Sequence, residues 1–523
     1  MLTFEVIIKN GRIIDGTGNP WFNSCLCIRD GRVVEMKRRV KEEGMKVIDA
    51  AGMIVAPGFI DYHNHSDLTL LANPRAESYI HQGVTTVCIG NCGQSPAPIS
   101  DEYREELEEY FAYHAHGIKV PMDWSTYGEY LTKLENTGLG LNVAPFVGHG
   151  TIRIAVMGFN KTSPTSEEME KMKALVDQAF MDGVFSLSSG LDYVPNIYSD
   201  TQEIIELCKV AAKHSGVYTT HTRGSDLKAV REAIEIGREA GVPVHVLHYQ
   251  WSLATSLSVF EEARDKGLDI TFDAYPYDGG CGSLDAQLQE FEGGWLFEGG
   301  VRIFFERIKK LKVREKLKRG LKEIDWNLLH VAVCRSPESK RYEGKSIMEV
   351  AKSKGVHPVD AYCDLILENE GVAMQVYRHQ LIEEVTIRAL KHPAMVIGSD
   401  GWALAPHGDL FVGTPHPRCY GTYPRILGRY VREEGVLTLQ EAVRKMTSFP
   451  AQRLGLTDRG LLREGSWADI VIFDPKKVGD KATYDHPHQY PKGIEYILVN
   501  GQVTLEKGEH TGALAGRVLR KQR

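Results

Sequence analysis

The sequence predicts an α/β protein: a (β/α)8 TIM-like barrel with a small β-sandwich domain built from both chain termini. Two observations carry this prediction. In the middle of the chain, eight short apolar segments alternate with amphipathic stretches of about 10 to 15 residues. At both ends, apolar and polar residues alternate as they do in half-buried strands. A chain of 523 residues is also long enough for more than one domain.

The two ends of the chain carry similar strand-and-turn patterns. Near the start, alternating segments turn at Asn10-Gly11 and at Asp30-Gly31, pairs that favour tight hairpins. Near the end, the run YILVNGQVTLE closely matches the early run VIIKNGRIIDG. Because each piece is too small for a core of its own, we expect residues 1–56 and 456–523 to pair into one sandwich domain.

Residues 57–455 are expected to form the barrel, because eight parallel strands are the number that closes one. The eight proposed strands are IVAPGFIDYHNH, TTVCIGN, LNVAPFVGH, GVFSLSSG, GVYTTHTR, PVHVLHY, DITFDAYPY and AMVIGSD. The stretch of about residues 284–349, between the seventh and eighth strands, does not follow the repeat. We therefore expect it to be an inserted subdomain.

Composition excludes several classes of function. The formal net charge of -7 is spread along the chain, without the clustered basic surface of a nucleic-acid-binding protein. The N-terminal segment lacks the pattern of a signal peptide, and no apolar run approaches membrane-spanning length. Nine cysteines without regular spacing do not form a disulfide framework. We therefore expect a cytoplasmic protein that binds neither nucleic acid nor a membrane.

Six side chains of metal-binding types stand at the C-terminal ends of predicted strands. His63 and His65 end the first strand, where period-two alternation points both rings the same way. The other four are Cys92 after the second strand, His221 after the fifth, His248 after the sixth and Asp400 after the eighth. Because the strand C-termini of such a barrel meet at the active-site face, we expect all six in one site.

The chemistry of this set points to zinc. Zinc is bound by thiolate, imidazole and carboxylate groups, and a catalytic site uses three protein ligands and leaves a position for water. Cys92, His221 and His248 make one such set, and the other three side chains would hold a second metal or help to orient a water at the first. Zinc acidifies water and polarises a carbonyl, so amide hydrolysis is the expected reaction. Asp400 would be the general base that passes the water's proton to the leaving nitrogen.

The chain resembles the amidohydrolase superfamily and, within it, the D-aminoacylases, or N-acyl-D-amino-acid deacylases. The resemblance covers nearly the whole length. The matching motifs are GFIDYHNHSD, GVTTVCIGNCGQSPAP, GVFSLSSGLDYVP, THTRGSD, YPYDGG, IGSDG, HPRCYGTYPRILGRYVRE and MTSFPAQRLGLTDRGLLREGSWADIVIFDP. The most diagnostic is GNCG, because the D-aminoacylases place a cysteine there. Other amidohydrolases bridge two metals with a lysine carbamate or a glutamate from the fourth strand.

The fourth strand of this chain offers only Ser186, Ser188 and Ser189, none of which can replace a carbamate, whereas Cys92 is present. This pattern argues against the hydantoinase and dihydroorotase branches. The resemblance implies one tight zinc on Cys92 and the histidines of the fifth and sixth strands. It places the remaining three side chains around a weaker second divalent metal.

The resemblance also implies substrate contacts. Tyr193, Tyr275, Ser283 and Arg418 match positions where the family lines its pocket, and Arg418 would bind the substrate α-carboxylate. The alternatives are that this arginine pairs with a loop carboxylate and that the tyrosines only pack. One position departs from the family, which commonly reads His-x-Lys after the sixth strand, whereas this chain has Gln250. The change removes a cation from the predicted substrate contacts.

The sequence thus predicts a zinc-dependent amide hydrolase that deacylates N-acyl-D-amino acids or related D-residue compounds. One alternative is hydrolysis of cyclic amides or small D-residue peptides on the same metal site. Another is a non-catalytic scaffold, which retention of all six ligands disfavours. The expected partner is a small-molecule N-acyl amino acid or small peptide, and a homo-oligomer is compatible with the sequence. His149, after the third strand, is a candidate to orient a ligand or the water.

Overall fold

The computed structural model describes residues 4–41 and 43–521. Eight parallel strands form one sheet in the order β18-β14-β13-β12-β11-β10-β9-β8. A parallel bridge between Asn64 and Gly401 joins the two ends of this row and closes it into a barrel, as predicted. The strands are β8 (Phe59–Asp61), β9 (Val84–Ile89), β10 (Asn142–Gly148), β11 (Ser186–Gly190), β12 (Val217–His221), β13 (Val244–Val246), β14 (Ile270–Ala274) and β18 (Met395–Ile397).

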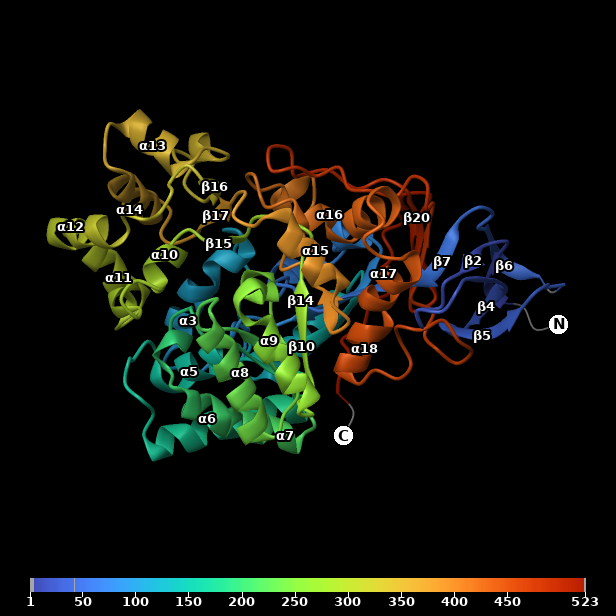
Figure 1. Ribbon diagram of the computed structural model, residues 1–523, viewed down its shortest axis with the longest axis horizontal. Helices are drawn as coiled ribbons and strands as arrows, with labels where there is room; N and C mark the ends of the chain where they lie inside the picture. Colours follow the sequence, from blue (N-terminus) through green and yellow to red (C-terminus); the bar gives the residue numbers. More distant parts are fainter. Residues whose placement is uncertain (1–3, 42, 522–523) are drawn as a thin grey trace.

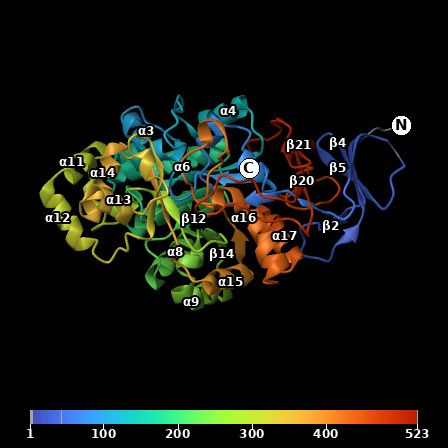
Figure 2. The ribbon, with the colours of Figure 1, turned by 90° about the horizontal axis from the view of Figure 1, so that it is seen from above.

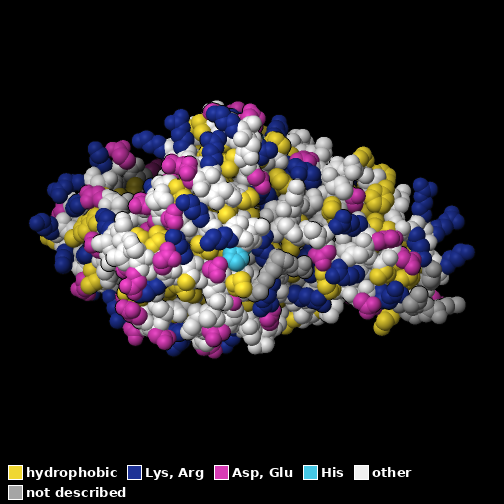
Figure 3. Space-filling model, turned by 90° about the horizontal axis from the view of Figure 1, so that it is seen from below, with side chains coloured by type: hydrophobic (Ala, Val, Ile, Leu, Met, Phe, Trp, Pro, Cys, Tyr) yellow, Lys and Arg dark blue, Asp and Glu magenta, His cyan; other side chains and the backbone are white. Residues whose placement is uncertain are grey.

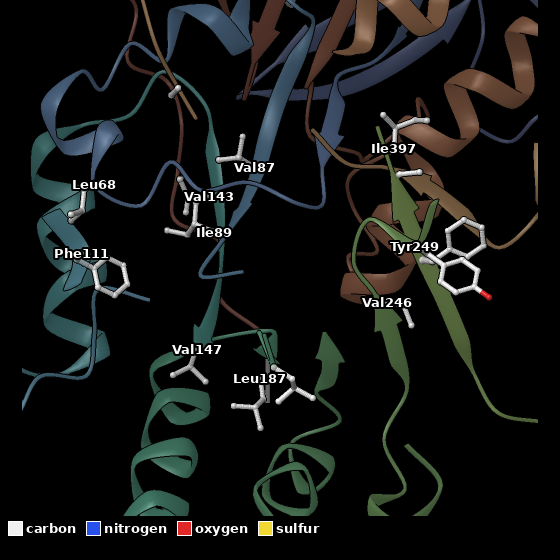
Figure 4. Packing of buried hydrophobic residues seen from close by; sticks show 14 of the residues in the cluster. Leu68, Val87, Ile89, Phe111, Val143, Val147, Leu187, Val246, Tyr249 and Ile397 are labelled. Atoms are coloured by element: carbon white, nitrogen blue, oxygen red, sulfur yellow. The ribbon is translucent and has the colours of Figure 1, made fainter. Parts of the chain in front are cut away.

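The barrel strands are short and apolar because helices cover them from outside while side chains fill the interior. Every residue of β9, β10, β11 and β14 is buried. Figure 4 shows part of this core, with Val87 of β9 beside Val143 of β10. The surrounding helices include α4 (Tyr127–Thr137), α5 (His149–Met157), α6 (Ser166–Asp182), α7 (Thr201–Lys213), α8 (Leu227–Ala240), α9 (Leu253–Asp265) and α15 (Glu383–Lys391).

Both ends of the chain build the second domain, which lies at the right in Figure 1 and Figure 2. One sheet has the order β5-β4-β1-β6, and the other, β22-β21-β20-β19-β7-β2-β3, mixes strands from both termini. Ile8 and Ile28 pack in one cluster with Ile470 and Leu498. The central pairing joins β7 (Ile54–Pro57) to β19 (Ile470–Phe473). The other strands are β1 (Phe4–Lys9), β2 (Arg12–Ile13), β3 (Phe22–Asn23), β4 (Cys25–Arg29), β5 (Arg32–Lys37), β6 (Gly44–Asp49), β20 (Ile494–Val499), β21 (Gln502–Glu506) and β22 (Glu509–His510).

A separate lobe lies between β14 and β18, at the upper left of Figure 1. Its three-stranded sheet has the order β15-β17-β16, so the lobe continues beyond residue 349 to the end of β17. It matters for function because β15 and α10 stand beside the C-terminal ends of the barrel strands. Its elements are β15 (Cys281–Ser283), α10 (Ala286–Gln289), α11 (Val301–Ile308), α12 (Leu311–Gly320), β16 (Leu329–Cys334), α13 (Ile347–Lys354), α14 (Pro358–Glu368) and β17 (Ala373–Tyr377).

The surface carries charges of both signs. On the face shown in Figure 3, Lys and Arg side chains are interspersed with Asp and Glu side chains. Across residues 4–41 and 43–521, no helix combines the length and apolar character needed to cross a bilayer.

Candidate metal centre

The six predicted ligands converge at the C-terminal ends of the barrel strands. They form two groups of side chains whose ligand atoms lie within 4.8 Å of one another, and Cys92 belongs to both. One group is His63, His65, Cys92 and Asp400; the other is Cys92, His221 and His248. Residues separated by more than 300 positions therefore share one site.

Short contacts connect the members of the first group. The Cys92 Sγ lies 3.3 Å from the Nε2 of His63, and the same ring nitrogen lies 3.2 Å from Oδ1 of Asp400. That carboxylate oxygen is also 3.1 Å from the Nε2 of His65. In the second group, the rings of His221 and His248 meet edge to face with their centroids 4.4 Å apart.

Three of the six residues have a left-handed backbone, which non-glycine residues rarely adopt. The φ angles are 53° at Cys92, 34° at His248 and 54° at Asp400. Such conformations cost of order 1–3 kcal/mol each and are concentrated at functional sites. Here each of them occurs in the turn that follows a barrel strand.

The loop that carries Cys92 packs closely against the fourth strand. The backbone N–H of Gly93 donates to the hydroxyl of Ser188, 3.1 Å away. A Cβ added to Gly190 would lie 2.1 Å from the carbonyl oxygen of Cys92. The small residues of the fourth strand thus leave room for the cysteine loop.

The electrostatics favour an ionised thiol and an ionised carboxyl. Burial opposes ionisation of Cys92, but His63, followed by His221 and His248, holds the pKa of its thiol well below the usual value. Burial likewise opposes ionisation of Asp400, but the Arg418 guanidinium and then His63 hold its pKa well below the usual value. The neighbouring cations therefore favour the anionic form of both groups.

The histidines supply the positive charge that balances these anions. Against burial, Asp400 and then Cys92 raise the pKa of His65 to about 9, and Asp192 and then Cys92 raise that of His221 to about 10. A bound divalent cation would replace those protons.

The donor set fits zinc. The buried Nδ1 atoms of His65 and His221 have no hydrogen-bond partner among the described residues. Thiolate, imidazole and carboxylate donors in one buried cluster are what this ion takes.

Two acidic residues that sequence reasoning did not single out orient the histidines. Asp273 of β14 lies 3.2 Å from the Nδ1 of His63, and Asp192 lies 3.4 Å from the Nε2 of His221. The sequence feature that could have identified Asp273 is an acidic residue within a largely apolar predicted strand. No comparable signal marks Asp192, because it stands in a polar loop.

A cavity of about 370 Å³ opens above the centre. Among its lining residues are His221, His248 and Asp400 and two of the predicted substrate contacts, Tyr193 and Tyr275. Ser283 lines a smaller adjoining cavity, together with Cys92 and Trp402.

Two other predicted contacts lie behind the cavity wall. The side-chain amide of Gln250 donates to the carbonyl of Tyr275 and accepts from its backbone N–H, at 3.2 and 3.3 Å. The Arg418 side chain is 1% exposed, and its Nη1 lies 2.8 Å from Oδ2 of Asp400. Its guanidinium also stacks over the Tyr275 ring, 4.9 Å from the centroid.

The His149 ring contacts residues outside the predicted metal site. Its Nδ1 lies 2.9 Å from Oδ1 of Asn196, and its Nε2 lies 2.7 Å from Oε1 of Glu203. Both ring nitrogens are thereby occupied away from the six predicted ligands.

Known proteins with similar sequences act on acylated D-amino acids. A family model described as "Amidohydrolase family" matches residues 46–99 and 375–505. The chain is 33% identical to a D-aminoacylase of Alcaligenes xylosoxydans xylosoxydans, over 99% of this chain and 97% of that protein. An N-acyl-D-aspartate deacylase of the same organism is 33% identical over 97% and 93% of the two chains.

Solved structures show the same similarity. The N-acyl-D-glutamate deacylase of Bordetella bronchiseptica, complexed with zinc and a phosphonate inhibitor, has a TM-score of 0.82 at 30% identity, over 99% of this chain and 100% of that one. A D-aminoacylase described with a binuclear metal centre gives 0.82 at 32% identity, over the same shares of the two chains. A D-hydantoinase, with a TM-score of 0.57 at 15% identity, shares the fold alone.

Proposed function

Because this chain belongs to the D-aminoacylase family of amidohydrolases, we propose that it is a zinc-dependent hydrolase that removes the acyl group from N-acyl-D-amino acids or related D-residue compounds. The observation that carries the proposal is the cluster of Cys92, His221 and His248 at the base of a cavity. The cavity is of the size that small ligands occupy.

In this proposal, Cys92, His221 and His248 hold one zinc, and His63, His65 and Asp400 surround a second, weaker position. Zinc bound by the first set would acidify a water and polarise the amide carbonyl of the substrate. The sulfur of Cys92 also lies within 4.8 Å of the ligand atoms of His63, His65 and Asp400, which makes it the residue on which metal binding depends most.

Asp400 is the proposed general base. Its carboxylate is ionised and lines the cavity, where it can take a proton from the attacking water and pass it to the leaving nitrogen. Arg418 keeps the carboxylate ionised and oriented through its contact with Oδ2. Arg418 would bind a substrate α-carboxylate only if the bound substrate displaced its guanidinium from Asp400.

Tyr193 and Tyr275 form the proposed walls for the substrate, and Ser283 a polar contact beside the smaller cavity. Gln250 contributes indirectly, because its amide holds the Tyr275 backbone in place. We further infer that the enzyme works in the cytoplasm, which is supported by nine cysteines whose irregular spacing is unlike that of a disulfide framework.

The test is a panel of N-acetyl-D-amino acids and N-acetyl-L-amino acids with the zinc-loaded enzyme, with the released amines identified by mass spectrometry. We expect hydrolysis of D-compounds, loss of activity after zinc is removed by a chelator, and recovery when zinc is returned. Preference for L-compounds, or faster hydrolysis of hydantoin or dihydrouracil rings, would contradict the proposal.

A further inference from the structure

The cavity above the metal centre is negatively charged on the side of the inserted lobe. Two carboxylates, Asp192 and Glu290, line it in addition to Asp400. None of the described residues that line it is a lysine or an arginine. Arg418 lies behind the wall and is paired with Asp400. The positively charged His221 of the lining pairs with Asp192, so the lining offers an incoming substrate side chain the negative charge of Glu290.

Glu290 stands at the end of α10, where the lobe meets the barrel. Its carboxylate forms no hydrogen bond and no ion pair with any residue of 4–41 or 43–521. The residue is exposed to solvent. Partial burial of its carboxyl group and then the Asp192 carboxylate raise its pKa to about 7, against the opposing effect of His221. Both acids line the same cavity, where a bound cation would be attracted by Glu290.

Asp192 already contacts Gly224 and His221, so Glu290 is the carboxylate available to bind a substrate side chain. Both carboxylate oxygens of Asp192 accept the backbone N–H of Gly224, at 2.8 and 2.9 Å. One of them also lies 3.4 Å from the Nε2 of His221.

Aromatic rings held in place by hydrogen bonds form part of the cavity wall. The indole N–H of Trp251 donates to the hydroxyl of Tyr275, 3.1 Å away. The hydroxyl of Tyr377, on β17, accepts from the side-chain amides of Gln287 and Gln375 at 2.7 and 2.6 Å. Trp251 and Tyr377 both line the cavity, and aromatic rings attract cations and pack against the methylene groups of lysine or arginine.

We propose that the cavity selects substrates with a cationic side chain, of the N-acyl-D-lysine or N-acyl-D-arginine type, and that Glu290 determines this selectivity. The inference rests on the proposed deacylase function and narrows its substrate class. An acidic side chain would be repelled by the Glu290 carboxylate, which has no ion-pair partner among the described residues, so N-acyl-D-aspartate and N-acyl-D-glutamate are the poorest substrates. Neutral side chains fall between these extremes.

The kinetic test compares Nα-acetyl-D-lysine, Nα-acetyl-D-norleucine and Nα-acetyl-D-glutamate at pH 8, where Glu290 is ionised. We expect kcat/KM to fall in that order. Glu290→Gln should lower kcat/KM for the lysine compound by about tenfold, the size of one charge-assisted hydrogen bond, and leave the norleucine compound nearly unchanged. Glu290→Lys should raise activity on the glutamate compound. The matched control is Glu292→Gln, which neutralises a carboxylate that pairs with Lys316 outside the cavity.

A binding measurement separates recognition from turnover. In an Asp400→Asn background, calorimetry should show tighter binding of Nα-acetyl-D-lysine than of the norleucine compound, and the difference should shrink with added salt and with Glu290→Gln. Equal binding of the two compounds, or an equal effect of Glu290→Gln on both, would overturn the inference while the deacylase function stands. If the zinc-loaded enzyme hydrolyses no N-acyl-D-amino acid at all, the proposed function itself fails.

Discussion

The Nδ1 atom of His63 lies 3.2 Å from Oδ1 of Asp273, and both side chains are fully buried. The same carboxylate oxygen accepts the backbone N–H of His248 at 2.7 Å, and Oδ2 lies 3.2 Å from the Nε2 of His245. One acid therefore orients His63, which follows the first barrel strand rather than ending it as expected, and the backbone of His248, which follows the sixth. Carboxylates in this position fix the ring orientation of metal-binding histidines.

Replacing that acid should weaken metal binding. We expect Asp273→Asn to lower zinc affinity by about 10- to 100-fold, because the amide cannot hold both histidines in the same way. Competition with a chromogenic chelator measures the affinity. Asp269→Asn is the matched control, since Asp269 precedes the opposite end of the same strand and pairs with Arg453. An Asp273→Asn protein with unchanged affinity would show that the contact is not needed to position the ligands.

Cys92→Ala should reduce both zinc content and turnover, because the sulfur belongs to both groups of ligands. Zinc is measured by atomic emission on the purified protein. Cys88 lies on β9, the strand that precedes the Cys92 loop, in a separate apolar cluster, so Cys88→Ala should keep its zinc. Full metal occupancy in the Cys92→Ala protein would refute the role of the thiolate as a ligand.

Asp400→Asn should separate metal binding from catalysis. We expect close to one zinc per chain, held by Cys92, His221 and His248, and a turnover reduced about a hundredfold or more by loss of the base. The same preparation serves for the zinc assay and the rate assay. Near-normal turnover would exclude Asp400 as the general base.

Gly190→Ala should disturb the cysteine loop through steric overlap. The added Cβ would lie 2.1 Å from the Cys92 carbonyl oxygen and 2.7 Å from the Tyr193 ring, so the loop must move. We expect a loss of about 1–3 kcal/mol in the free energy of unfolding, with weaker zinc binding. At Gly479 an added Cβ makes only ordinary contacts, so Gly479→Ala should be mild. Equal effects of the two changes on zinc binding would argue against the close packing of the loop.

His510 should make the protein less stable in acid. Its Nδ1 accepts the N–H of Gly512 and its Nε2 donates to the carbonyl of Arg75, an arrangement that requires the neutral ring. Burial and then Arg75 lower its pKa to about 4. The unfolded chain, with a pKa near the ordinary value of about 6.5, therefore binds the proton first as pH falls. Stability from His510 is complete above about pH 6.5 and is lost as the pH falls towards 4.

The difference between wild type and His510→Asn isolates this contribution. Asparagine keeps an acceptor and a donor but does not titrate in this range. We expect the thermal midpoint of the wild type to fall further between pH 7 and pH 5 than that of the variant. Parallel pH profiles would show that His510 does not titrate differently in the folded and unfolded chains.

The barrel and the composite terminal domain were predictable because local patterns encode them. Seven of the eight apolar segments became β9 to β14 and β18, whereas the first, IVAPGFIDYHNH, divided into β7 of the terminal domain and the barrel strand β8. The similarity between the runs near Asn10 and Asn500 marked strands that share one domain. The end of the inserted lobe was not predictable in this way. β17 belongs to it because it pairs with β15 and β16, and such long-range pairing leaves no periodicity in the sequence.

By itself, the sequence determined which donor atoms this protein brings to its site, because a parallel barrel delivers every residue that follows a strand to the same face. The tertiary structure alone decided which groups those donors contact. In the folded chain, Asp273 contacts His63, and Arg418 contacts Asp400. Gln250 contacts the backbone of Tyr275, and Glu290 lines the cavity. These contacts depend on how loops and a lobe pack across the barrel mouth, and packing over such distances is a property of the whole folded chain.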